Sequence, residues 1–155
     1  MMTARFWPYP IRHPFPSLHF LCEAWWTCYS SGRHTWRRRS DAMLAVGQPI
    51  SVIPRTAREQ LDLVTASEPR WPDPVPDLLG VSCRIGRVSV WLPIEDQGGL
   101  LHRFSLLALL PRQDLPDAPP FILLGMQFLL ERQALLEADC SAGLVTAATC
   151  RLILP

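Results

Sequence analysis

Histidines and cysteines, the residue types best suited to holding a metal ion, gather in the first 34 positions of this chain. They are His13, His19, Cys22, Cys28 and His34. Structural zinc sites usually place two to four residues between paired cysteines, whereas five residues separate Cys22 from Cys28. We therefore expect buried thiols and surface imidazoles here, with no metal site and no cofactor.

An aromatic residue joins a basic run at Trp36-Arg37-Arg38-Arg39. Proteins that bind single-stranded nucleic acid combine such residues over a wide basic surface. The net charge of the chain is only +1, so no whole-molecule field attracts nucleic acid or an acidic membrane. We interpret the arginines as a solvated strand edge, which also discourages edge pairing, and expect no nucleic-acid partner.

Two segments carry a resemblance to the retropepsin-like aspartic proteases. In that family the active-site loop begins Asp-Thr-Gly or Asp-Ser-Gly and continues into Ser or Thr, two β-branched residues and often Pro. A second family segment, two apolar residues and Gly followed by a short helix, is similar to residues 121–129. The first segment matches at Gly47, Ser51, Val52, Ile53 and Pro54.

The catalytic aspartate of that pattern is replaced by Ala45. An aspartic peptidase needs two carboxylates that share one proton, one from each subunit of a retropepsin-like homodimer. The methyl group of Ala45 can neither take nor give a proton. Asp41 cannot substitute, because four residues of strand at ~3.3 Å each would hold its carboxylate roughly 13 Å away.

The neighbouring position departs from the family pattern as well. Val46 stands where the family has Thr or Ser, whose hydroxyl bonds across the dimer beneath the catalytic pair; Val keeps the shape of Thr without that bond. We expect Gly47 to serve a tight turn with positive φ. The degenerate site is thus Ala45, Val46 and Gly47, and the resemblance implies that cleft contacts fall to Gln48, Ser51, Leu124 and Gly125.

The elements that position these segments are predicted to be strands, because 16 prolines in 155 residues oppose long helices. Residues 1–17 read as a proline-rich extended arm and residues 18–155 as one domain. Residues 18–29 and 35–46 form a hairpin across the Ser30-Ser31-Gly32 turn. Residues 55–64 have helical spacing, and 68–76 form a proline-rich loop.

In the second half of the chain, apolar and polar residues alternate in a pattern that predicts further strands. Residues 81–92 change register at Gly86, where we expect a bulge or a bend. They pair with residues 101–110, an apolar run predicted to be buried on both faces, across a turn at 96–99. A strand at 121–124, a helix at 125–132, and strands at 135–139 and 144–154 complete the prediction, with a covering flap between Glu68 and Val88 implied by the resemblance.

The composition of the chain predicts where in the cell the protein is located. The longest internal apolar run, residues 104–110 with Ser105 inside it, is far below the ~20 residues that a membrane span requires. Prolines interrupt the N-terminal apolar stretch that a signal peptide would need. The five cysteines are odd in number and scattered, so we expect reduced thiols and a cytoplasmic location. All basic residues are arginine, which indicates a GC-rich, bacterial source.

We conclude from the sequence that this is a mainly β, retropepsin-like closed barrel or sandwich subunit with one or two short helices. The expected function is that of a catalytically inactive homologue, which binds a peptide or another protein and forms a possible homodimer. Two alternatives remain open. The chain could be active only with a partner subunit that carries Asp, or it could be an unrelated all-β domain of unknown function.

Overall fold

The computed structural model describes residues 1–11, 17–30, 34–55, 77–116 and 121–155. Strands dominate this part of the chain, as predicted, and the helical element α2 (Met126–Glu131) is short. Two 3-10 turns, η1 (Glu95–Gln97) and η2 (Val145–Ala147), join strands. The strands are β1 (Met2–Ile11), β2 (Ser17–Ser30), β3 (His34–Leu44), β4 (Ser51–Val52), β5 (Asp77–Leu78), β6 (Val81–Ile94), β7 (Leu100–Pro111), β8 (Ile122–Leu124), β9 (Leu135–Asp139) and β10 (Thr149–Leu154).

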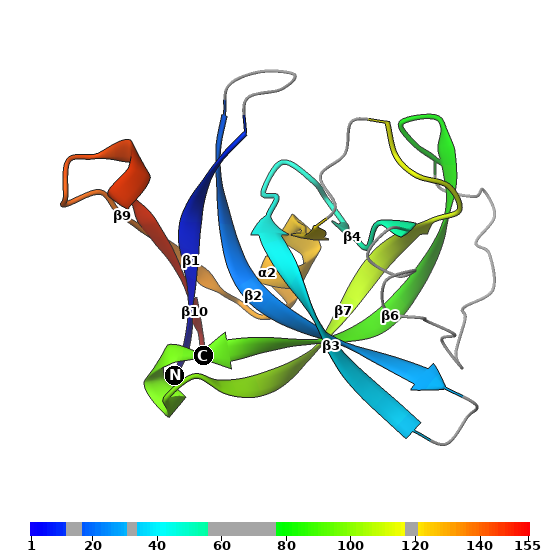
Figure 1. Cartoon of the computed structure of the whole chain (residues 1–155), viewed down its shortest axis with the longest axis horizontal. Helices are drawn as coiled ribbons and strands as arrows, with labels where there is room; N and C mark the ends of the chain where they lie inside the picture. Colours follow the sequence, from blue (N-terminus) through cyan, green and yellow to red (C-terminus); the bar gives the residue numbers. More distant parts are fainter. Residues whose placement is uncertain (12–16, 31–33, 56–76, 117–120) are drawn as a thin grey trace.

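Six of these strands close into a barrel (Figure 1). The order around it is β6, β7, β4, β8, β3 and β2. The barrel closes where β2 returns to β6, with Trp25 opposite Trp91 and Trp26 opposite Val90. In the closed barrel each of these strands is paired with a neighbour on both sides, so none of the six is an unpaired edge strand there. The predicted closed β-barrel is therefore confirmed.

Strand β1 connects the barrel to a second, smaller sheet. Its first half pairs with β10, from Met2 opposite Leu154 onward, and its second half pairs with β2, from Trp7 opposite Leu21 onward. Strand β9 then pairs with β10 and ends the sheet. Residues 1–17 were predicted to lie outside the domain as an arm. The structure differs, because Ala4 and Phe6 of β1 are buried in the main core.

The two predicted hairpins are present. Strands β2 and β3 pair from Leu21 opposite Met43 to Ser30 opposite His34. Strands β6 and β7 pair from Cys83 opposite Pro111 to Ile94 opposite Leu100, on either side of η1. Gly98 and Gly99 follow η1 with φ of 66° and 81°, a conformation that glycine adopts without steric cost. Short-range turn signals therefore located both hairpins correctly.

Of the bulge or bend expected at Gly86, the bulge is absent. The β6–β7 register runs without a break from Ile85 opposite Leu109, through Gly86 opposite Ala108, to Arg87 opposite Leu107. The alternation of buried and exposed residues changes because the two parts of β6 bury opposite faces. Cys83 packs with Val52 and Leu109 in a second cluster, whereas Val88 and the following alternate residues face the main core. Strand β7 is continuously buried only from residue 108 to 111 and alternates before that.

The main core fills the barrel and the space beneath α2. Phe104 of β7 meets Phe128 of α2 edge to face, with ring centroids 5.8 Å apart. Leu106, Ile122 and Leu124 are fully buried around them. The predicted helix at residues 55–64 and loop at 68–76 lie almost wholly outside the described residues. Within the described part, no helix has the length and apolarity of a membrane span.

Candidate functional site

The loop between β3 and β4 contains Ala45, Val46 and Gly47 and is held by backbone hydrogen bonds. The Ala45 amide donates to the Leu124 carbonyl at 2.9 Å, and the Gln48 amide donates back to the Ala45 carbonyl at 2.9 Å. From the other side, the amides of Met126 and Gln127 donate to the carbonyls of Gln48 and Pro49 at 2.9 and 2.8 Å. The two segments that carry the family resemblance therefore pack directly against each other.

Gly125 allows this close approach. A Cβ atom built on Gly125 would lie 2.7 Å from the backbone carbon of Ile50 and 2.8 Å from the Gln48 carbonyl oxygen. Contacts this short with backbone atoms cannot be relieved by a side-chain rotation. Its φ of −86° is open to any residue, so the requirement for glycine is close approach and not backbone conformation.

Ser51 adds a side-chain hydrogen bond to the contacts between the two segments. Its hydroxyl is fully buried and its Oγ accepts a hydrogen bond of 2.9 Å from the Gly125 amide. Leu124 is also fully buried. Ser51, Leu124 and Gly125 were expected as substrate-binding or cleft residues; they are buried and support the loop, and their contact with a ligand stays a prediction. Gln48 is only partly buried and stays a cleft candidate.

The three positions of the degenerate motif differ in exposure. Ala45 is partly buried, Val46 is 51% exposed, and Gly47 is exposed. The predicted positive φ at Gly47 is wrong, because its φ lies outside the left-handed region and a Cβ there would meet nothing within 4 Å. Nothing in the structure explains why glycine stands at this position.

A hollow of about 420 Å³ opens beside this loop. Its described lining contains no carboxylate, and its titratable side chains are His19 and Cys150. Burial raises the pKa of the Cys150 thiol, which keeps it protonated and unreactive at neutral pH. The lining residues are Leu18, His19, Phe20, Leu44, Ala45, Val46, Gly47, Leu136, Ala138 and Cys150.

Asp41 does not belong to this hollow. It lies on β3 opposite Glu23 of β2, and both line a different hollow together with Trp7 and Tyr9 of β1. The sequence prediction that Asp41 cannot replace the missing aspartate agrees with this placement. Sequence reasoning missed the site formed by Trp7, Tyr9 and Glu23, although the aromatic residues at alternate positions 7 and 9 signal a shared strand face.

The other predicted features are only partly described. Cys22 is buried. Its burial raises the pKa of its thiol, and the negative charges of Asp41 and Glu23 raise it further. His13 lies outside the described residues, and within them no group of three potential ligands could hold a metal ion. In the range predicted for the flap, the described part forms the β5–β6 hairpin, whose turn at Leu79 and Gly80 has positive φ at both residues, as a type I′ turn requires.

Comparison with known proteins identifies the fold of the chain. No protein-family model matches the chain, and no curated protein matches its sequence. Among solved structures, the chain is similar to a retropepsin-like aspartic protease from Rickettsia conorii, with a TM-score of 0.51 and 14% identity over 97% of this chain and 91% of that one. The chain therefore has a retropepsin-like fold, with Ala45 in the loop that carries the family resemblance.

Proposed function

We propose that this protein is a retropepsin-like aspartic protease homologue that has lost peptidase activity and acts by binding a peptide or another protein. One observation carries the proposal: the hollow beside Ala45, Val46 and Gly47 has no carboxylate in its described lining. General acid–base catalysis alone contributes about 10²–10⁴-fold in rate. Without a carboxylate at the loop, a dimer of this chain cannot assemble the acid–base pair.

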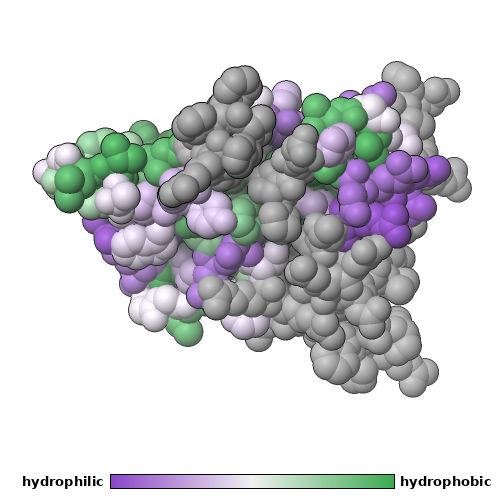
Figure 2. All heavy atoms as spheres, turned by 45° about the horizontal axis from the view of Figure 1, so that its top comes forward, coloured by the Kyte–Doolittle hydropathy of each residue, from purple (hydrophilic) through white to green (hydrophobic). Residues whose placement is uncertain are grey.

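The apolar surface around that hollow supports a role in binding. Val46 is 51% exposed and Leu136 is 40% exposed, and both line the hollow. Leu135, Leu144 and Val145 are exposed by 59–69% on β9 and the turn that follows it. Figure 2 shows hydrophobic surface at the left end of the molecule, where Figure 1 places β9. Such patches commonly mark interaction surfaces.

A second copy of the chain is the occupant that we favour for this surface. Strand β9 ends the sheet, and all five of its residues are exposed. An edge strand of this kind offers backbone donors and acceptors for pairing with another strand. A homodimer across β9 would cover Leu136 and bring two copies of the loop toward each other.

Two measurements test the proposal. The purified protein should not cleave denatured casein between pH 3 and 7, and pepstatin-sensitive cleavage would refute the loss of activity. Its mass by light scattering should be that of a dimer at micromolar concentration. Leu136→Glu should shift the mass to a monomer, whereas the control Leu100→Glu, at the exposed first residue of β7, should not. A monomeric wild-type protein at all concentrations would refute the homodimer.

A further inference from the structure

Three neighbouring strands form a second hollow that is separate from the loop of Ala45. Its volume is about 330 Å³, close to the lower end of the range for small-ligand sites and suited to one side chain. It shares no lining residue with the hollow at Ala45. The lining residues are Trp7, Pro8, Tyr9, Leu21, Glu23 and Asp41.

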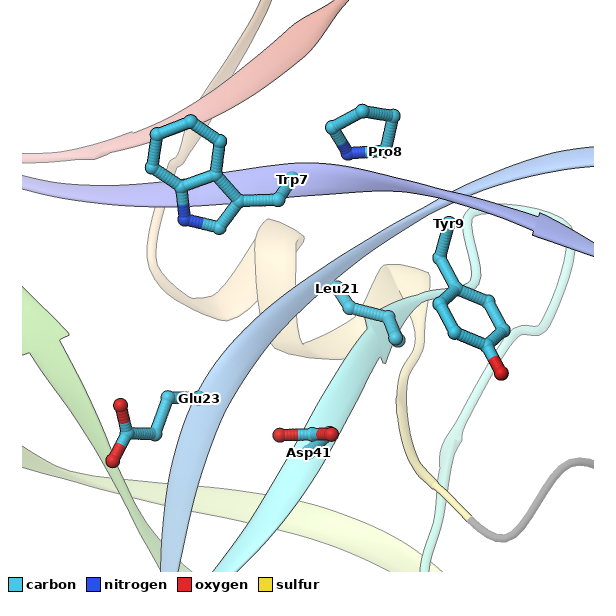
Figure 3. Close-up of a pocket in the computed structure, with 6 residues that line it drawn as sticks. All are labelled: Trp7, Pro8, Tyr9, Leu21, Glu23 and Asp41. Carbon is cyan, nitrogen blue, oxygen red and sulfur yellow. The ribbon is translucent and has the colours of Figure 1, made fainter. Parts of the chain in front are cut away.

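The strand register explains why these side chains meet. Trp7 of β1 is opposite Leu21 of β2, and Glu23, two residues further along the same face, is opposite Asp41 of β3. Figure 3 shows the rings of Trp7 and Tyr9 to either side of Leu21, at the upper left and at the right, and the carboxylates of Glu23 and Asp41 below it. The hollow therefore has aromatic walls, an apolar floor and a doubly acidic end.

Both aromatic rings are accessible and positioned. Trp7 is 56% exposed and Tyr9 is 41% exposed. The Tyr9 ring is held by an edge-to-face contact with Phe121 at 5.3 Å between centroids. The Trp7 ring already makes a cation–π contact with Arg5, whose Cζ lies 5.6 Å from the ring centroid. Arg5 also forms an ion pair with Glu95, with 2.5 Å between the two groups. The charged residues of the lining are Glu23 and Asp41.

We propose that this hollow, formed by Trp7, Tyr9, Leu21, Glu23 and Asp41, binds an arginine side chain of a protein partner. A guanidinium is planar, stacks on aromatic faces and presents donors in a fork that matches carboxylates. Carboxylates at opposed positions of paired strands stand close enough to receive one such fork. Glu23 and Asp41 each have another interaction in the protein, but a carboxylate has about four acceptor positions.

Other cations fit the hollow less well. A quaternary ammonium would use the rings, yet it has no hydrogen to donate to Glu23 or Asp41. Calcium takes six to eight oxygen ligands, and two carboxylates between aromatic walls supply too few. An ammonium is a compact, strongly hydrated charge that gains less than a guanidinium from stacking. The pairing of rings with opposed carboxylates therefore selects arginine.

Calorimetric titration of the full-length protein tests the proposal with four probes. These are acetyl-Gly-Arg-Gly-amide, its citrulline and lysine analogues, and choline. The arginine peptide should bind saturably, and the citrulline peptide, which has the same shape without the charge, should bind at least about tenfold more weakly. Equal binding of the two peptides, tighter binding of choline or lysine, or no saturable arginine binding would each overturn the proposal.

Substitutions then assign the binding to this hollow. Glu23→Gln and Asp41→Asn should each weaken arginine-peptide binding about tenfold, whereas Asp114→Asn, at an exposed position elsewhere, should leave it unchanged. Unchanged binding in both hollow variants would overturn the site. The citrulline comparison uses the unaltered protein, so it decides the chemistry even if a variant fails to fold. Tighter binding of free arginine than of the peptide would overturn the assignment to a protein partner.

Discussion

The backbone amide of Gly125 donates a 2.9 Å hydrogen bond to the Oγ atom of Ser51, which lies 74 positions earlier in the chain. This bond joins the start of β4, directly after the loop of Ala45, to the residue between β8 and α2. Both residues are buried, so neither group can turn to solvent if its partner is removed. The loop between β3 and β4 is thus held in a defined conformation.

Ser51→Ala should lower the free energy of unfolding by about 1–3 kcal/mol, because it leaves the buried Gly125 amide without its acceptor. Urea denaturation followed by circular dichroism measures the loss. Ser82→Ala is the matched control, since Ser82 is exposed on β6 and its loss should change the stability by less than about 0.5 kcal/mol. Equal effects of the two substitutions would contradict the role assigned to Ser51.

Ala45→Asp combined with Val46→Thr should give weak proteolysis at acidic pH, provided that the protein dimerises. Two aspartates brought together titrate as a coupled pair, with one apparent pKa raised by the like charge of the other. Specific activity on a fluorogenic peptide should rise with protein concentration as dimers form. Ala45→Asn with Val46→Thr is the control, because it has nearly the same shape without an ionisable group. Activity in that control would show that the two carboxylates are not its source.

Acid should weaken the attachment of α2 to β6. Two hydrogen bonds from Arg87 hold Glu131, at 2.9 and 3.1 Å. The hydrogen bond from Arg87, followed by that from Gln127, lowers the pKa of Glu131 from its ordinary value of 4.5. A lowered folded-state pKa means that the stabilisation is present above about pH 4.5 and is lost as the pH falls through the folded value.

Glu131→Gln should therefore make stability less dependent on pH below 4.5, as measured by urea denaturation at several values from pH 6 to 3. The Arg87 side chain is 55% exposed, so solvent screening keeps the contribution of this ion pair to stability small. Asp114→Asn serves as the control for a general effect of removing a carboxylate. An identical acid response in wild type and Glu131→Gln would show that this ion pair does not contribute.

The sequence alone determined the features that depend on neighbours along the chain. Turn residues located the β2–β3 and β6–β7 hairpins. In the second hairpin, Gly98 and Gly99 permit the positive φ of the turn. The resemblance paired the segments around Ala45 and Gly125, and their backbone hydrogen bonds confirm that contact. The identity of Ala45 is a sequence fact that no fold can alter.

Only the tertiary structure decided the features that depend on residues far apart in the chain. The prolines near the N-terminus indicated an arm, yet β1 joins the core because Met2 is opposite Leu154, a pairing that no local pattern reveals. Ser51 is a short polar residue whose burial follows from packing against Gly125. The hollow of Trp7, Glu23 and Asp41 needs three strands in register. Side chains that are unrelated in sequence meet there because strand pairing sets their distances.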